Sequence, residues 1–248
     1  MKKNLASTAL VIISLLLAAC QADLPGRTTT INGSGNVITE TRPVSNFENI
    51  TFSGVGEMLI TQGDTESLTL EAEDNVAAII TTEVKDDTLT IGFTQNNINL
   101  RPTQPIKFNV SVKTLNNFRI TGAGNVYMPA LQTEQFALRI SGAGNVKIDH
   151  LDAADLTVIL SGASNTSVGG QVNSQTIELT GVGNYGARDL SSQSATVLLS
   201  GAGNATVWAQ KSLDAEISGF GSVNYYGTPE VQRKITGAGN IKSLGSQP

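Results

Sequence analysis

The sequence of 248 residues has very few of the residues that build covalent or catalytic sites. It contains one cysteine, Cys20, and one histidine, His150. A single cysteine excludes a disulfide within the chain, so the fold must be stable through its core and backbone hydrogen bonds. A single histidine, with no nucleophile motif around any serine, gives no support to serine or cysteine nucleophile chemistry. We therefore expect no catalytic residues, no metal site and no cofactor.

Basic and aromatic residues are also scarce. Lys and Arg number 16 against 21 Asp and Glu, which gives a formal net charge of -5 and argues against a nucleic-acid partner. Aromatic residues make up 5% of the chain, whereas glycine occurs 25 times. This composition suits many short strands better than packed helices. No segment beyond the first twenty residues shows a helical stripe of apolar residues, so we expect an all-β fold.

The first residues have the pattern of an export signal. Lys2 and Lys3 precede an apolar run over residues 9–19, which is too short to span a bilayer as a helix. The run ends in Leu-Ala-Ala-Cys, which resembles the bacterial lipobox, where the cysteine is diacylated and becomes the new N-terminus. We therefore predict a signal peptide over residues 1–19, a lipid on Cys20, and a tether over residues 20–30.

The residue after the lipobox points to a location. Gln21 stands where an aspartate usually retains lipoproteins at the inner membrane of enterobacteria, so the resemblance implies an outer-membrane lipoprotein, in the periplasmic or the cell-surface leaflet. Residues 1–19 carry two lysines and no acid, so their removal changes the formal charge from -5 to -7. The expected membrane contact is thus the N-terminal lipid.

A repeat of 18 to 20 residues dominates the rest of the chain. Each copy contains a phrase such as SGAGN, and on both sides of it apolar residues alternate with polar ones, as in strands with one buried face. Short strands at this interval favour a parallel β-helix with coils about 4.8 Å apart. Right-handed winding is the default for parallel crossovers. The first glycine of the phrase falls at Gly122, Gly142, Gly162, Gly181, Gly201, Gly219 and Gly237.

The pattern divides the exported chain into three parts. We expect a broader N-terminal β part over residues 31–115, repeated coils over 116–243, and a tail over 244–248. The phrase also occurs upstream, as INGSGNV at Ile31–Val37 and ITFSGVGEM at Ile50–Met58. Between these and the coils, the sequence predicts strands from Ser67 (SLTLEA), Thr88 (TLTIGF) and Ile106 (IKFNVSV), and one helical turn over Asp74–Ile80 capped by Asp74.

The repeated glycines need a geometric reason, because thirteen glycines in regular structure cost about 7–13 kcal/mol relative to alanine. The reason is either a positive φ or backbone packed too closely for a Cβ. The first glycine is present in every copy, whereas the second is replaced by Ser164 in one, so the first position is the stricter. Both have inward parity and could form a stripe where the coil is thinnest. A dinucleotide loop is not supported, since a strand rather than a helix follows.

The outward positions beside the glycines would form ladders in a stack of coils. Asparagine ladders bond one coil to the next, and that structural role is the first interpretation. The alternative is a face that binds a glycan, another protein or a second copy of the chain. The candidate face consists of Ser141, Asn145, Ser161, Asn165, Thr180, Asn184, Ser200 and Asn204.

Two further groups are candidates for function. Asp149, Asp152 and Asp155 lie near one turn, and acidic clusters on β-helices can serve glycan hydrolysis or calcium-dependent cleavage of uronic acids, although solvated turn acids are commoner. Late in the chain, Trp208 and the pair Tyr225-Tyr226 could cap the last coil or stack on a sugar ring.

The order of these segments resembles a known family. FENITFSGVGEMLITQGDTESLTLEAEDN, then DDTLTIGF, then IKFNVSVKTLNNFRITGAGNV, then repeated SGAGN coils are similar to the head GIN domain of auto-transporter adhesins, from about Ile31 to Ile241. The resemblance implies a β-solenoid and, commonly, a lipoprotein of unknown function. It supplies no catalytic residues.

Three functions remain open at this point. The first is a lipid-anchored, non-enzymatic envelope protein whose solenoid face serves adhesion or binds a protein or glycan. The second is a polysaccharide-active enzyme that uses the turn from Asp149 to Asp155. The third is an envelope assembly or stress component that binds a protein partner through its β edge.

Overall fold

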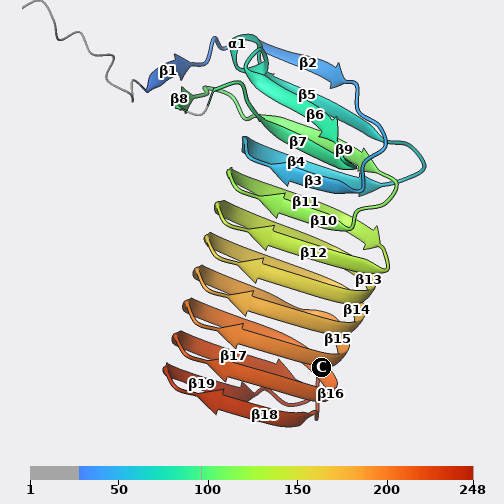
Figure 1. Ribbon diagram of the computed structural model, residues 1–248, viewed down its shortest axis with the longest axis vertical. Coiled ribbons are helices and arrows are strands. Elements are labelled where there is room, and N and C mark those ends of the chain that lie inside the picture. Colours follow the sequence, from blue (N-terminus) through green and yellow to red (C-terminus); the bar gives the residue numbers. More distant parts are fainter. Residues whose placement is uncertain (1–27, 96, 248) are drawn as a thin grey trace, which may run out of the picture.

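The computed structural model describes residues 28–95 and 97–247 and consists almost entirely of strands stacked into a rod (Figure 1). One sheet holds 17 strands, and a second holds two. The elements are β1 (Thr29–Asn32), β2 (Val37–Arg42), β3 (Asn49–Phe52), β4 (Val55–Gln62), β5 (Ser67–Glu73), α1 (Asp74–Ala77), β6 (Ile80–Lys85), β7 (Thr88–Phe93), β8 (Ile98–Arg101), β9 (Lys107–Val112), β10 (Asn117–Ile120), β11 (Ala123–Gln132), β12 (Gln135–Ile140), β13 (Ala143–Leu160), β14 (Ala163–Leu179), β15 (Val182–Leu199), β16 (Ala202–Ile217), β17 (Phe220–Tyr226), β18 (Glu230–Ile235) and β19 (Ala238–Ser243).

The strands from β10 onward form a parallel β-solenoid, as the repeat predicts. Each coil pairs with the next at the repeat distance, so that Asn145 lies beside Asn125 in the preceding coil and Asn165 in the following one. Strand β13 covers a whole coil in 18 residues because its parallel pairing with β14 continues around the corners, with a register shift between Ile148 and Leu151. The predicted fold class, a parallel solenoid with 18 to 20 residues per coil, is confirmed.

The core of the rod is a stack of inward columns. One column runs through Phe118, Leu138, Val158, Ile177 and Val197, and each of these side chains is fully buried. Burial of one such side chain contributes about 1.5–3 kcal/mol, so the repeated column is a main source of stability. The alternation of apolar and polar residues thus predicts correctly which side chains face inward.

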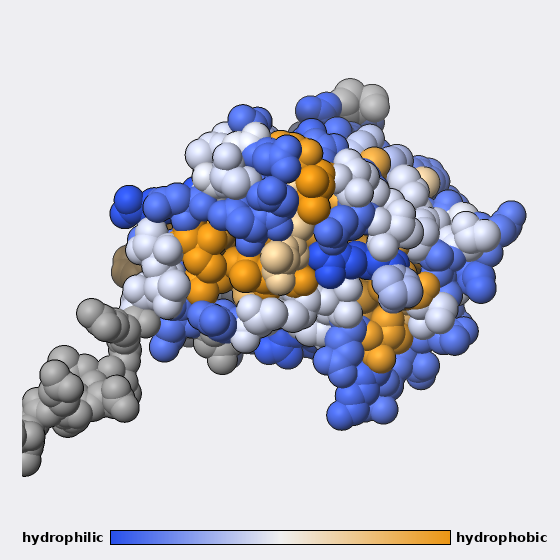
Figure 2. All heavy atoms as spheres, turned by 90° about the horizontal axis from the view of Figure 1, so that it is seen from above, coloured by the Kyte–Doolittle hydropathy of each residue, from blue (hydrophilic) through white to orange (hydrophobic). Residues whose placement is uncertain are grey.

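The N-terminal part forms a cap on the solenoid. Strands β3 and β4 lie parallel to β10 and β11 and make the first coil, whereas β2 and β9 pair antiparallel with β5, and β6 pairs antiparallel with β7. The three strands predicted from Ser67, Thr88 and Ile106 correspond to β5, β7 and β9. Apolar side chains are visible between polar ones at the cap end (Figure 2), and Ile38 and Leu100 are among those that pack half-buried on the core.

One prediction about the cap is wrong. The helical turn exists as α1, but its N-cap residue is Glu73 and not Asp74. The Asp74 carboxylate instead accepts hydrogen bonds from the Ser34 hydroxyl and the Asn36 amide. The phrase at Ile31–Val37 belongs to the N-terminal β part and does not form a coil, because β1 pairs with β8 and β2 runs antiparallel to β5.

The loop after β1 surrounds the buried carboxylate of Glu73, so its glycines have a different role from those of the coils. Glu73 is 1% exposed and accepts hydrogen bonds from the Gly35 N–H (2.6 Å), the Thr103 N–H (2.9 Å) and the Thr103 hydroxyl (2.6 Å). A Cβ on Gly33 would overlap this carboxylate. The hydrogen bonds from Thr103 and Gly35 lower the pKa of Glu73.

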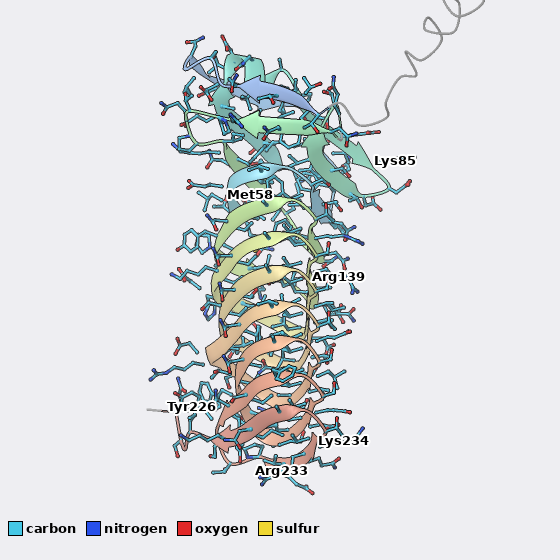
Figure 3. The ribbon with its side chains drawn as sticks, turned by 90° about the vertical axis from the view of Figure 1, so that its left-hand side faces the viewer. Met58, Lys85, Arg139, Tyr226, Arg233 and Lys234 are labelled. Atoms are coloured by element: carbon cyan, nitrogen blue, oxygen red, sulfur yellow. The ribbon has the colours of Figure 1, made fainter. Side chains whose placement is uncertain are left out.

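The opposite end of the rod finishes at β18 and β19. There the inward column of Val197 and Ala215 continues into Arg233, which is exposed. Arg233 and Lys234 lie at the end of the rod far from the cap (Figure 3). The tail returns toward the coils, since the Leu244 N–H donates to the Tyr225 carbonyl and the Gly227 N–H to the Gly245 carbonyl.

Candidate functional site

The chain bends at the first glycine of each repeat, and the strands that follow these bends form one parallel sheet. The outward side of this sheet has three columns of side chains, and we call it the Asn face. It is built from β4, β11, β13, β14, β15, β16, β17 and β19, in that order along the rod. Successive side chains of a strand point to opposite sides, so the residues one, three and five places after the first glycine point outward together. The first column is apolar, the middle column contains mainly amides, and the third column contains both polar and apolar residues.

The middle column is a hydrogen-bonded ladder of asparagines. From Asn145 to Asn204, each side-chain Nδ2 donates to the Oδ1 of the asparagine in the preceding coil, and the Asn204 Oδ1 accepts the Ser222 N–H at 3.1 Å. Each amide uses one N–H and one lone pair in the ladder, which leaves one N–H and one lone pair directed at solvent or a partner. The ladder distances are 2.9 Å for Asn145 to Asn125, 3.2 Å for Asn165 to Asn145, 2.9 Å for Asn184 to Asn165, and 3.0 Å for Asn204 to Asn184.

The first column is apolar along the whole rod and largely exposed. Its two most exposed large members are Val182 near the middle of the column, which is 64% exposed, and Phe220 toward the far end, which is 70% exposed, whereas Val55 at the cap end is 41% exposed. An exposed phenylalanine in line with small apolar residues is typical of an interaction surface, although single exposed apolar residues are common. In order from the cap, the column contains Val55, Ala123, Ala143, Ala163, Val182, Ala202, Phe220 and Ala238.

A groove of about 910 Å³ crosses the part of the Asn face nearest the cap. Its lining combines ladder amides with the third column, including Tyr127 and Lys147, and with Leu59 and Lys107 from β4 and β9. Tyr127 is 40% exposed, so its ring is available at the groove wall. Apolar walls with a few fixed polar groups are the usual composition of a binding site.

Three side chains beside the groove hold one another in place. The Tyr127 hydroxyl donates to Asp149 Oδ2 at 2.5 Å, Lys147 Nζ lies 2.8 Å from Asp149 Oδ1, and Lys147 Nζ lies 5.4 Å from the Tyr127 ring centroid. Hydrogen bonds from Lys147 and Tyr127 lower the pKa of Asp149, and the Asp149 carboxylate raises the pKa of both partners. Near neutral pH the group is therefore a carboxylate, an ammonium and a neutral phenol.

The residues of the candidate face are all exposed, but they lie on two sides of a bend. The asparagines Asn145, Asn165, Asn184 and Asn204 lie on the Asn face. The serine and threonine residues precede the bend, at the end of the previous strand. The Ser141 hydroxyl donates to the Ile120 carbonyl and the Ser161 hydroxyl to the Ile140 carbonyl, both at 3.4 Å. Thr180 and Ser200 occupy the same place in later coils. The groove is therefore a feature of the asparagine side.

The first glycine of each repeat is required by close approach of the coils. A Cβ on Gly142 would lie 1.9 Å from the Gly122 carbonyl oxygen, and one on Gly162 would lie 1.8 Å from that of Gly142. These first glycines have no positive φ; positive values occur at the second glycine of the phrase, for example 149° at Gly183. Gly122, Gly181, Gly201, Gly219 and Gly237 show the same overlap, with distances from 2.0 to 2.2 Å.

The acidic turn does not form a convergent site. Asp149 is paired with Lys147, Asp152 lies beside Gln171 in the next coil, and Asp155 accepts a hydrogen bond from the Ser174 hydroxyl. Asp152 and Asp155 line different hollows. Among residues 28–95 and 97–247, no three His, Cys, Asp or Glu side chains are grouped so that they could hold a metal ion.

The late aromatic residues have separate surroundings. Tyr225 packs half-buried on the core, Tyr226 lies under the Arg188 guanidinium at 5.6 Å, and Trp208 pairs in register with Tyr226. None of them lines the groove. These positions favour the structural role at the end of the solenoid over stacking on a sugar.

The sequence interpretation missed a polar group inside the rod. The Tyr185 hydroxyl donates to Gln175 Oε1 at 3.2 Å, Gln175 Nε2 donates to the Ser192 hydroxyl at 2.9 Å, and that hydroxyl donates to the Trp208 carbonyl at 2.7 Å. Burial raises the pKa of Tyr185, which stays neutral. Tyr185 and Gln175 break the apolar inward pattern, and that break was the available signal.

Cys20 lies outside the described residues, as does the predicted signal peptide. Within the described part of the chain, α1 is four residues long, and no helix has the length and apolar character to cross a bilayer.

Comparison with known proteins gives a family and a set of similar structures. Residues 46–229 match the family described as "Putative auto-transporter adhesin, head GIN domain". A putative adhesin from Bacteroides fragilis is 29% identical, with a TM-score of 0.82, over 86% of this chain and 100% of the other. A putative lipid binding protein from Parabacteroides distasonis is 26% identical, with a TM-score of 0.71, over 87% and 100%. No curated protein matches the chain.

Proposed function

The chain belongs to the head GIN domain family of auto-transporter adhesins, and we propose that it is a lipid-anchored, non-enzymatic envelope protein that presents the Asn face for adhesion. The observation that carries the proposal is the Asn face itself. Its ladder amides are exposed over several coils while retaining free donors and acceptors, and its cap-side half is hollowed into a groove. A repeated polar surface on a rigid rod can bind through many weak contacts at once.

The sequence predicts a lipid anchor on Cys20. Cys20 ends a segment that resembles a lipobox, and the described chain begins at the cap end with Thr28, eight residues further on. Eight residues span at most about 29 Å, so a lipid on Cys20 would hold the cap near the membrane surface. The C-terminal coils would then be free to extend away from it.

A non-enzymatic role fits the chemistry of the face. The groove lining contains one carboxylate, that of Glu57, and the Asp149 carboxylate beside the groove is already occupied by Lys147 and Tyr127. Asp152 and Asp155 of the turn line other hollows, so the paired carboxylates that glycosidases need are not assembled at the groove. The geometry favours binding over turnover.

One cell experiment tests both parts of the proposal. Bacteria that express the full chain should bind to a layer of the same cells, to a protein surface or to a glycan surface more than cells without it. Cys20→Ser should move the protein from the membrane to the soluble fraction and remove the gain in adhesion. Tyr127→Ala, in the groove, should reduce adhesion, whereas Leu198→Ser, which is exposed elsewhere on the rod, should not. Unchanged membrane partitioning of Cys20→Ser would rule out the lipid anchor.

A further inference from the structure

We propose that the partner of the Asn face is the Asn face of a second copy, packed with the two rods antiparallel. Phe220 near the far end of one copy would then pack against small residues of the first column near the cap of the other. The inference rests on the adhesive function proposed above and names its partner. It follows from the positions of the large, small and charged side chains on one face.

The groove and the largest apolar side chain of the Asn face lie toward opposite ends of the rod. Counted from the cap, the groove is lined by β9 and by the first five strands of the face, β4 to β15, and its lining includes residues of the middle and third columns and none of the first. In the first column, Val182 lies on the fifth strand and Phe220 on the seventh. Antiparallel pairing places Phe220 of each copy against the cap-side part of the other, where the first column contains the small residues Ala123 and Ala143.

A two-fold axis parallel to the strands and passing through β15 brings these features together. It exchanges the third strand with the seventh and the fourth with the sixth, and it leaves each outward column opposite its own counterpart. In the first column Phe220 then faces Ala143 of the second copy, and Val182 faces Val182. Each large apolar residue meets a small one or its own equivalent at the axis, which permits close packing of the two faces.

The other two columns are also compatible with this pairing. In the middle column Asn165 faces Asn204 and Asn184 faces its own equivalent, and each of these amides has one N–H and one lone pair free to bond across the interface. In the third column the exposed Lys242, on the eighth strand, faces the exposed ring of Tyr127, on the second. An ammonium over a tyrosine ring is attractive by about 0.5–1 kcal/mol.

The charged residues at the two ends of the Asn face also favour antiparallel pairing. Glu57 lies in the middle column of the first strand, next to the Tyr127 strand, and Lys242 lies at the far end. Antiparallel pairing brings each Lys242 toward the end that carries Glu57. Parallel pairing would instead place the two Lys242 side chains at the same level, and the groove opposite a second groove.

The area is sufficient for a weak specific contact. Seven shared strands at about 4.8 Å spacing, each with five residues at about 3.3 Å, cover about 34 by 17 Å, or about 1,100 Å² over both copies. Specific interfaces begin near about 1,000 Å², so the expected pairing is reversible. Many anchored copies on two surfaces would add to a stable attachment.

The antiparallel arrangement has a consequence for anchored molecules. The described chain begins at the cap, so paired rods have their N-terminal ends at opposite ends of the dimer (Figure 1). Two copies held by Cys20 in different membranes can form this pair with both rods upright. The arrangement is therefore suited to attachment between two cells that both carry the protein.

Site-directed crosslinking tests the geometry in the full chain. Cys20 is the only cysteine, so Cys20→Ser provides a thiol-free background. Packed sheets lie about 10 Å apart, which exceeds the reach of a disulfide, and a short bismaleimide is the suitable reagent. Val182→Cys should give a covalent dimer, because its two copies meet at the axis. Asn125→Cys, in the middle column, should not crosslink to itself but should crosslink when mixed with Asn240→Cys.

The controls separate this inference from other outcomes. Leu198→Cys, which is 41% exposed away from the Asn face, should remain monomeric. Phe220→Asp should weaken dimerisation at least tenfold in sedimentation equilibrium while leaving the circular dichroism spectrum unchanged. A self-linked Asn125→Cys would show parallel pairing and overturn the inference, as would a monomeric Val182→Cys. If cells still adhere to protein or glycan surfaces in that case, the adhesive function stands and only the second copy as partner is excluded.

Discussion

Close approach of the coils requires the first glycine of each repeat, and Gly162→Ala tests this requirement. A Cβ at Gly162 would lie 1.8 Å from the Gly142 carbonyl oxygen, whereas real Cβ contacts are longer than 3.0 Å. The coils would have to separate locally, which strains the hydrogen bonds from Ala163 N–H to that oxygen (3.0 Å) and from Gly162 N–H to the Ile140 carbonyl (3.1 Å). Two weakened bonds at about 1 kcal/mol each, with about 1–3 kcal/mol of overpacking, give a loss of about 3–5 kcal/mol.

The matched control is Gly186→Ala in the next coil. There the nearest atom to an added Cβ is the Thr166 carbonyl oxygen at 3.8 Å, which is ordinary contact. Since alanine restricts the unfolded chain more than glycine, this variant should be neutral or more stable by up to about 1 kcal/mol. Urea unfolding followed by circular dichroism measures both free energies. A Gly162→Ala variant within about 0.5 kcal/mol of Gly186→Ala, the size of a usual surface effect, would refute close approach as the reason for the glycine.

Two other predictions concern polar groups. The pKa of Glu73 is lowered below its ordinary value of 4.5 by bonds from Thr103 and Gly35, so its contribution to stability is present above pH 4.5 and is lost as the pH falls through the folded pKa; Glu73→Gln should lower the melting temperature at about pH 7 and reduce the loss of stability between about pH 5 and about pH 3, measured by thermal melts across that range. Asn165→Ala removes two ladder bonds, of 3.2 and 2.9 Å, and should cost about 1–2 kcal/mol in urea unfolding, whereas a change within error would mean that the exposed ladder adds no stability.

Much of the fold could be predicted because each repeat in the sequence corresponds to one coil of the structure. The distance between successive first glycines equals the pairing distance between coils, since each glycine must stack on the carbonyl of the previous one. The same phrase at Ile31–Val37 has a different structure, because the segments around it decide which strands it pairs with. That segment meets β8 and the Glu73 carboxylate instead of another coil, and no local pattern reveals partners so distant in sequence.

The candidate site was predictable only in part. The asparagine column follows from the repeat, because stacked amides at equal spacing bond to one another. The groove does not follow, since its walls include Lys107 of β9, whose position depends on how the cap meets the first coil. The grouping of Tyr127, Lys147 and Asp149 likewise depends on the pairing of β11 with β13, which places two of them side by side.

The last coil bears on how such a rod can associate. Its strands β18 and β19 present an open sheet edge, which would be a template for end-to-end stacking. Arg233 stands there in an inward column that is otherwise apolar, and Lys234 is paired with Glu216 of the previous coil. Stacking a further coil on this end would bury the Arg233 guanidinium without a partner, at a cost that exceeds the gain from strand pairing. Association through the end is thereby disfavoured, while the Asn face carries Glu57 and Lys242 near its two ends, where antiparallel pairing brings opposite signs together. The same chain thus opposes growth along its axis and permits pairing along its side, which is the behaviour that a reversible contact between two anchored molecules needs.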